Sequence, residues 1–263
     1  MAPLDPALVR ALHPGVTRRR HLRSAGAPHE VFQTSTLAAL LDGAYEGDVT
    51  FGELRQHGDL GLGTLQRLDG EMIALDGEFW QASADGSVRP IADGERTPFA
   101  VVCPFTPDLT TELPTKGHDD LLSAIERYID VGTGTAAFRI DGRFSTVVAR
   151  SVPRQQRPYP PLAAVADQQV VFEWHDLDAT VVGFRFPDVA AGIELPGYHL
   201  HIISADRTRG GHVLRADLVY GDMQVDRLST LRLELPPGVQ LPGAPDEERA
   251  EVLSGIERGP KAA

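Results

Sequence analysis

Cysteine is nearly absent from this 263-residue sequence, in which Cys103 is the only one. A single thiol cannot form an intrachain disulfide, and it cannot supply a cluster of thiolate ligands to a metal. Cys103 ends the apolar run at residues 99–103, where a thiol is more often buried and inert than nucleophilic. The sequence therefore excludes a thiolate-based metal cluster, and we expect Cys103 to lie in the core.

Long hydrophobic runs and an excess of positive charge are also missing. No stretch approaches the roughly 20 apolar residues that a membrane-spanning helix needs. The N-terminal region has no apolar signal core, and residues 16–23 are basic instead. The net charge of −12 repels the phosphates of nucleic acids and of anionic membranes. We therefore expect a cytoplasmic protein that binds neither nucleic acid nor a membrane.

Short strand patterns separated by turns occupy much of the chain. A hairpin is predicted at residues 136–152, with its turn at Asp141 and Gly142. Further strands are predicted at residues 169–174, 179–186, 197–204 and 211–220. This density of strands indicates a β-rich protein.

Few helices are predicted, and they are short. Ser35 or Thr36 can cap a helix whose first apolar residue is Leu37. Asp119 can cap a second helix, and its apolar side chains recur at helical spacing: Leu121, Leu122, Ile125 and Ile129. A terminal helix is predicted at residues 246–257.

The proline- and glutamine-rich segment at residues 153–168 is the best candidate for a domain boundary. We predict a loose arm at residues 1–30 and an N-terminal α/β domain at residues 31–152. Residues 153–263 would form a C-terminal β-rich, metal-binding domain that ends in the terminal helix. The predicted fold class is α+β: a β-rich architecture of two domains or two sheets, with mixed or antiparallel strands and a few short helices.

Three histidines form the most informative pattern in the chain. His199 and His201 alternate with apolar residues in a predicted strand, so their side chains project from the same face. A turn at residues 206–211 returns His212 toward them on the neighbouring strand. A packed core gains little from such a cluster of polar rings, which repel one another once protonated, so a metal site is favoured over a solvated strand face. The ligands suit Zn²⁺ best, and Fe²⁺, Mn²⁺, Ni²⁺ and Co²⁺ are compatible.

Several longer motifs, in the right order, resemble those of the bacterial α-acetolactate decarboxylase family. They lie at residues 32–43, 57–64, 68–71, 97–100, 150–153, 158–162, 192–201 and 210–212. Together they span roughly residues 31–220. The resemblance is far more specific than the histidine spacing alone.

The resemblance implies an enzyme that converts 2-acetolactate to acetoin and CO2 in the acetoin/butanediol pathway. Zn²⁺ would be held by His199, His201 and His212, and the enzyme would be a homodimer. The zinc would act as a Lewis acid on the ketone oxygen and stabilise an enediolate.

The resemblance also implies roles for other polar residues. Glu71 would complete the metal environment or handle protons, and Arg150 would face the substrate carboxylate with its planar fork of donors. A C-terminal glutamate would reach back into the site, and we favour Glu257 over Glu251. Thr64 would bind substrate or only cap a turn.

Other interpretations of these residues stay open at this point. Without the resemblance, an exposed turn carboxylate is a serious alternative for Glu71, and a surface arginine at a strand end is a less favoured alternative for Arg150. A cupin-like three-histidine oxygenase or isomerase fits less well, since a glutamate usually follows its histidine pair and Ser204, Ala205 and Asp206 stand here. The non-catalytic alternative is a binding module stabilised by a closed zinc site.

Overall fold

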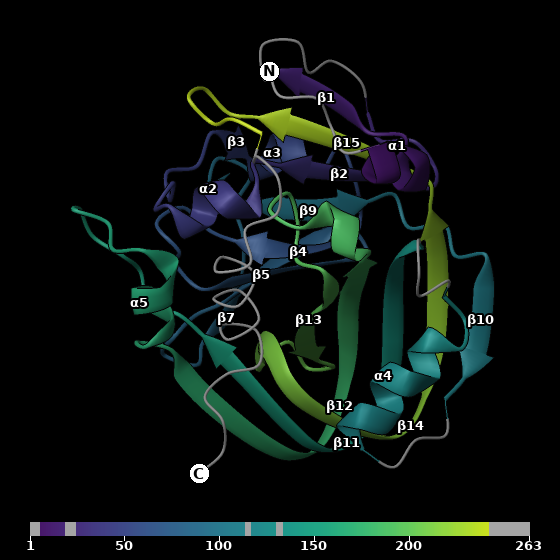
Figure 1. Ribbon diagram of the computed structural model, residues 1–263. Coiled ribbons are helices and arrows are strands. Elements are labelled where there is room, and N and C mark those ends of the chain that lie inside the picture. Colours follow the sequence, from purple (N-terminus) through teal and green to yellow (C-terminus); the bar gives the residue numbers. More distant parts are fainter. Residues whose placement is uncertain (1–5, 19–24, 114–116, 130–133, 242–263) are drawn as a thin grey trace.

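Two large β-sheets make up most of the molecule (Figure 1). The computed structural model describes residues 6–18, 25–113, 117–129 and 134–241. The predicted fold class is confirmed, because the strands form mixed and antiparallel sheets with only a few short helices. None of the helices in these residues is long and apolar enough to cross a membrane.

The first sheet has eight strands. In spatial order they are β1 (Gly15–Arg18), β15 (Thr230–Leu235), β2 (Glu30–Thr34), β9 (Ala100–Cys103), β4 (Leu60–Thr64), β5 (Glu71–Leu75), β6 (Glu78–Ala82) and β7 (Val88–Pro90). β15 runs parallel to both β1 and β2, and the other pairs are antiparallel. The last described strand of the chain therefore lies between the first two.

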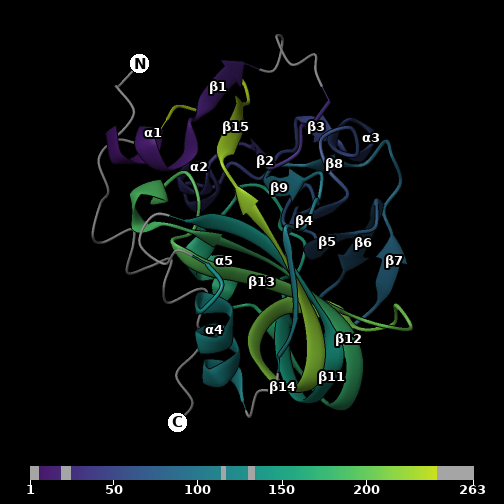
Figure 2. The ribbon, with the colours of Figure 1, turned by 90° about the vertical axis from the view of Figure 1, so that its right-hand side faces the viewer.

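The second sheet has five antiparallel strands, three of them unusually long. In spatial order they are β10 (Leu109–Glu112), β14 (Gly210–Leu228), β11 (Thr135–Ser151), β12 (Val170–Phe186) and β13 (Gly197–Ser204). β13 pairs with β12 and also with the start of β14, so β11, β12, β13 and β14 close on themselves. Figure 2 shows the long strands curling together at the lower end of the molecule.

The remaining elements are small. β3 (Val49–Thr50) and β8 (Arg96–Thr97) form a two-stranded ribbon. The helices are α1 (Pro6–Leu12), α2 (Leu37–Leu41), α3 (Phe51–Leu54), α4 (His118–Glu126), α5 (Leu162–Ala166) and the 3-10 turn η2 (Asp188–Ala190). The Thr36 hydroxyl caps α2 by accepting a hydrogen bond from the Ala39 amide, as predicted. α4 begins one residue before the predicted cap, since Gly117 occupies the N-cap position.

The hydrophobic core has three parts, and the alternation of strand side chains separates them. The inner face of the first sheet packs on the second sheet, with Ile73 and Val101 meeting Val182 and Phe184. Their neighbours along the strands point to the outer face, where they pack with α3; these are Met72, Ala74, Ala100 and Val102. α4 covers the second sheet with the predicted apolar residues Leu121 and Ile125, and Ile129, just after the helix, packs in the same cluster.

Two predicted turns are wrong. The expected hairpin at residues 136–152 is one strand, β11, in which Asp141 and Gly142 pair with β12 and β14 on either side. Likewise, the two strands expected at residues 169–174 and 179–186 are one strand, β12. Irregular register near Phe144 lets β11 bend without ending. Turn-forming residues there mark a bend in a long strand.

The predicted segments differ from the sheets at two further places. Residues 6–18, within the expected loose arm, contain α1 and β1, because β1 finds a partner in β15. The expected boundary between residues 152 and 153 separates β11 from β12, which pair within one sheet. The proline-rich segment is therefore the connection of a long hairpin. The terminal helix predicted at residues 246–257 lies outside the described residues.

Candidate metal centre and catalytic pocket

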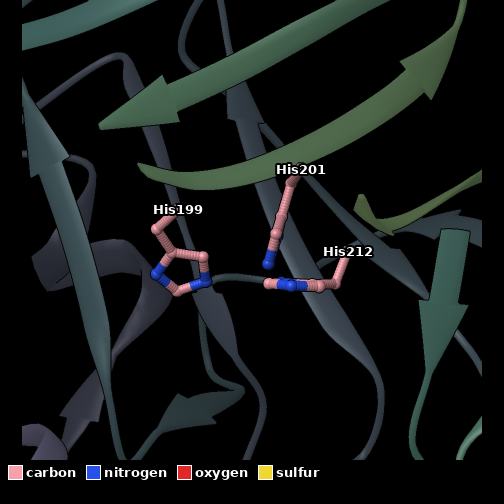
Figure 3. Close-up of side chains that lie close together, drawn as sticks. All are labelled: His199, His201 and His212. Atoms are coloured by element: carbon pink, nitrogen blue, oxygen red, sulfur yellow. The ribbon is translucent and has the colours of Figure 1, made fainter. Parts of the chain in front are cut away.

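The three predicted histidines converge between the two sheets. His199 and His201 lie two residues apart on β13, and His201 stands directly opposite His212 on β14. The ring centroids are 5.2 to 5.3 Å apart, and one nitrogen of each ring lies within 4.8 Å of the others. Figure 3 shows the three rings directed toward one another. The hairpin predicted from the sequence thus brings its three imidazoles together.

Gly211 allows the close strand packing that places His212. A Cβ atom there would stand 2.7 Å from the Arg150 carbonyl oxygen on the neighbouring strand β11. That distance is below any normal contact, so a larger residue would push the strands apart. Arg150 pairs with His212 in the register of β11 and β14. The glycine therefore helps bring Arg150 and the histidines to one place.

His201 is fully buried and oriented by the main chain of the first sheet. Its Nδ1 donates a hydrogen bond to the Met72 carbonyl oxygen at 2.8 Å. Burial lowers the pKa of His201 well below its usual value, and the positive charges that His212 and Arg150 can carry lower it further. The ring is thus neutral at neutral pH, with its second nitrogen free of protons.

This ring satisfies the requirements of a metal ligand. Its Nε2 atom is buried and has no hydrogen-bond partner among the described residues, and it faces the other two imidazoles. A metal-bound histidine commonly donates its other nitrogen to a carbonyl, as His201 does to Met72. The three residues therefore fit a divalent transition metal.

A buried ion pair lies beside the histidines. The Arg150 Nη1 atom donates to Glu71 Oε1 at 3.2 Å, and Glu71 Oε2 lies 3.6 Å from His201 Nε2. Arg150 and Glu71 are only 7% and 9% exposed in their side chains. This burial is inconsistent with the two alternative interpretations given above, an exposed turn carboxylate and a surface arginine.

Thr64 occupies the strand next to Glu71, with which it pairs in the first sheet. Its hydroxyl donates to the Gly70 carbonyl at 2.7 Å and thereby closes the turn between β4 and β5. The side chain is buried and also lines the pocket described next. Thr64 thus combines the turn role with a position at the site.

A pocket of about 60 Å³ brings these polar groups together with an apolar wall. The wall comes largely from α2 and α5, two short helices that contact each other at one side of the molecule (Figure 1). The lining residues are Leu37, Leu40, Gly63, Thr64, Leu68, Glu71, Phe99, Arg150, Val152, Leu162, Ala166, His199 and His212. Small size, apolar walls and a few convergent polar groups are typical of a site for a small molecule.

Comparison with known proteins identifies the family. Residues 31–241 match the sequence profile described as Alpha-acetolactate decarboxylase. The alpha-acetolactate decarboxylase of Methylococcus capsulatus is 44% identical over 209 residues, which cover 79% of this chain and 80% of that protein. The chain belongs to the alpha-acetolactate decarboxylase family. It is therefore an enzyme of the carboxy-lyase class, as the sequence motifs imply.

The relatives extend to solved structures. The alpha-acetolactate decarboxylase of Bacillus subtilis strain 168 is 38% identical over 208 residues, covering 79% of this chain and 82% of that protein. A crystal structure from the same strain has a TM-score of 0.82 at 34% identity and covers 88% of this chain and all of the other. A Staphylococcus aureus protein described as similar to alpha-acetolactate decarboxylase gives the same TM-score at 29% identity, covering 87% and 100%.

Some residues stand apart from this decarboxylase pocket. The predicted C-terminal carboxylate, Glu257 or Glu251, lies outside the described residues. His57, the first residue of the motif at residues 57–64, is buried with its ring centroid 4.0 Å from that of Phe32 and does not line the pocket. Cys103 is fully buried, and burial raises the pKa of its thiol well above the usual value, which agrees with an inert role.

Two features of the family pocket escaped the sequence interpretation. The apolar wall from Leu37, Leu40, Leu162 and Ala166 was not predicted, although the helical spacing of Leu37 and Leu40 marks one of its faces. The Met72 carbonyl that orients His201 has no sequence signal, because every residue carries a carbonyl.

Proposed function

We propose that this decarboxylase converts 2-acetolactate to acetoin and CO2 with Zn²⁺ held by His199, His201 and His212. The observation that carries the proposal is the meeting of three imidazoles with the Glu71–Arg150 pair at one small pocket, lined by two of these histidines, in an alpha-acetolactate decarboxylase. The proposal includes the acetoin/butanediol pathway, a cytoplasmic location and a homodimer, which the family resemblance implies.

Zinc is the metal that best suits three neutral nitrogen ligands with space left for substrate. When bound, it would act as a Lewis acid that draws electrons toward the ketone oxygen as CO2 leaves. The pocket reaches both His199 and His212, which supports an open catalytic site over a closed structural one. Catalysis by this group would require no organic cofactor.

Arg150 would bind the carboxylate that the substrate loses. Its guanidinium is buried at the pocket, and its Nε atom has no hydrogen-bond partner among the described residues. Glu71 holds the opposite edge of the group through the 3.2 Å hydrogen bond and so limits its rotation. A planar cation with a fixed edge can hold the substrate carboxylate in one orientation. In this orientation the C–C bond that breaks to release CO2 would point out of the plane of the ketone.

Glu71 would also move the proton that the reaction needs. Cleavage of the bond to CO2 leaves an electron pair on carbon, and one proton must join that carbon to give acetoin. Glu71 is a carboxylate within reach of the histidines and lines the same pocket. After taking a proton from solvent it could deliver this proton, and as the carboxylate it could orient the group that delivers it. The C-terminal carboxylate of Glu257, or of Glu251, is a further proposed participant.

The apolar wall and Thr64 would complete substrate recognition. 2-Acetolactate carries two methyl groups, and Leu37, Leu40 and Leu162 offer an apolar surface for them. Exclusion of water by this wall strengthens the electrostatic interactions around the carboxylate. Thr64 would contribute its hydroxyl oxygen as an acceptor, because its donor is used by Gly70.

The test is to mix purified, metal-analysed protein with racemic 2-acetolactate and to follow acetoin and CO2. We expect equal amounts of both products, loss of turnover with a chelator, and recovery when zinc is added back. No acetoin from a metal-loaded protein would refute the proposed substrate. Acetoin from fully metal-free protein would refute the role of zinc, and unfolding on metal removal would favour a structural site.

A further inference from the structure

A second concave site, outside the catalytic pocket, collects positive charge. Its described lining residues are Arg67, Arg154, Gln155, Gln156, Arg157 and Tyr159, and no carboxylate is among them. Three arginines in one hollow stand out in a chain with a net charge of −12. A concave patch of one sign concentrates counter-ions from solution. The ligand class that this hollow suits is a small anion.

This hollow, here called the arginine pocket, lies beside the catalytic pocket, because the same three segments line both. Arg67 precedes Leu68 of the catalytic pocket, and Arg154 follows two residues after Val152. The Cα atoms of two residues so placed are at most about 7.6 Å apart. Tyr159 likewise comes three residues before Leu162, on the segment that leads into α5. An anion held here is therefore close to the site where 2-acetolactate would react.

Main-chain contacts keep two of these segments together. The Gln155 amide donates to the Arg67 carbonyl oxygen at 2.7 Å, which ties the turn after β4 to the segment after β11. Gln155 itself is buried. The positions of Arg67 and Arg154 are thus defined by the backbone on which they stand.

Arg67 and Arg154 retain donors for a ligand. Arg67 Nε lies 3.8 Å from Glu46, and Arg154 Nη1 lies 3.8 Å from Asp69; both distances exceed hydrogen-bond length. The Arg67 Nε atom is buried and has no hydrogen-bond partner among the described residues. Both side chains are about half exposed, so a solute can reach them.

Arg157 differs from the other two because it is hydrogen-bonded to Glu46, whereas Arg67 and Arg154 make only longer ion pairs. Its Nη2 lies 3.0 Å from Glu46 Oε1, and its guanidinium stands 5.7 Å from the centroid of the Tyr159 ring. The Tyr159 hydroxyl also donates to Glu46, and this hydrogen bond is the main cause that lowers the pKa of Glu46. Glu46, Arg157 and Tyr159 therefore form the hydrogen-bonded frame of the pocket, and Arg67 and Arg154 supply its available donors.

We propose that Arg67 and Arg154 bind small carboxylate anions and so recruit the anionic substrate to the neighbouring catalytic pocket. The proposal rests on the proposed function, in which 2-acetolactate carries a negative charge. The acidic chain as a whole repels such a substrate, and a pair of guanidinium groups offsets this repulsion beside the catalytic pocket. Capture of this kind raises the rate of productive encounter and weakens as salt screens the charges.

The kinetic test compares two charge-matched double variants. Arg67→Gln/Arg154→Gln removes the proposed donors, and Arg89→Gln/Arg227→Gln removes two partly exposed, ion-paired arginines elsewhere. At low salt we expect kcat/KM of the first variant to fall about three- to tenfold, mainly through KM, and that of the control to change less than twofold. The difference should vanish at roughly 0.5 M salt, where screening is strong. Equal kcat/KM values for the two double variants would overturn the proposal.

A binding test separates this proposal from the catalytic one. The probe is 2-hydroxyisobutyrate, a carboxylate without a ketone, titrated calorimetrically into the zinc-loaded protein. We expect two bound carboxylates per chain in the wild type and in the control, and one in Arg67→Gln/Arg154→Gln. The same stoichiometry in all three proteins would refute the arginine pocket even if acetoin forms. Two sites falling to one would support it even if 2-acetolactate is not the substrate.

Discussion

The two halves of the catalytic pocket are built in different ways. The histidine half comes from one hairpin, β13 and the start of β14, and burial lowers the pKa of its central ring, His201, well below the usual value. The charged half, Glu71 and Arg150, comes from both sheets, with residues 79 positions apart in the chain. The hairpin brings the three rings together, and the first sheet adds only the Met72 carbonyl that orients His201, whereas the ion pair exists only when the two sheets pack. Metal binding and substrate orientation therefore depend on different parts of the fold.

Removing a histidine tests the first half and should have the largest effect. For His199→Ala we expect loss of bound zinc and a fall in kcat of at least about a thousandfold, since a two-histidine site no longer holds the Lewis acid. The matched control is His175→Ala, a change to an exposed histidine on β12. Metal analysis and the acetoin assay on both variants check this. Retention of full activity by His199→Ala would remove the metal from the mechanism.

Changing Glu71 should show whether metal binding by the histidine half is independent of the charged half. For Glu71→Gln we expect zinc to stay bound while kcat falls about a hundredfold, because the amide cannot exchange a proton. Glu78→Gln, on the neighbouring strand β6 and exposed, is the control. The measurements are metal content and the dependence of kcat on pH. If zinc is lost with activity, Glu71 is a metal ligand, and the division between the halves is wrong.

Breaking the ion pair from the arginine side should lower stability as well as activity. Arg150→Ala removes the guanidinium that pairs with the buried Glu71 carboxylate, which costs about 3 kcal/mol in the free energy of unfolding. The double variant Glu71→Gln/Arg150→Met removes both charges and should recover most of that stability without activity. Urea denaturation of the three proteins provides the measurement. Equal losses in the single and double variants would show that the charges are not coupled.

Acid should lower the free energy of unfolding through His57, which lies outside both halves of the pocket. Burial lowers the pKa of His57 in the folded protein to about 4, from its usual value of 6.5. Between pH 6.5 and pH 4, a proton therefore binds to His57 in the unfolded chain but not in the folded protein. The stability contributed by neutral His57 is complete above pH 6.5 and is lost as the pH falls toward 4, by up to about 3 kcal/mol. His57→Phe keeps the ring stacking on Phe32 and should lose less stability between pH 7 and pH 4.5. Parallel stability curves for both proteins would contradict this assignment, and activity at pH 7 should not change.

The two halves also differ in how well the sequence predicts them, because one is formed locally and the other by the packing of two sheets. The histidine half is visible in the sequence because strand alternation and a short turn determine it locally. Glu71 and Arg150 were placed at the site only through the family resemblance, since nothing in their own surroundings indicates that two sheets bring them together. Their contact and their burial emerge only from the packed structure.

The errors in the predicted fold have a related cause. Asp141 and Gly142 have turn chemistry, yet pairing with strands on both sides keeps β11 extended through them. Residues 15–18 carry no strong strand signal, and they become β1 because β15 lies beside them. In both cases long-range pairing outweighs local preference. The arginine pocket was equally invisible, because its residues come from separate segments that meet only in three dimensions.

The position of β15 has a consequence for biosynthesis. A ribosome releases β1 and β2 early, but their common partner spans Thr230–Leu235 and emerges last among the described strands. Until then, the two early strands have no neighbour between them, and their edges are open to chaperones or to other nascent chains. Completion of the first sheet is therefore a late event in translation. A ribosome that stalls before residue 230 would leave a chain with all three histidines and an incomplete sheet.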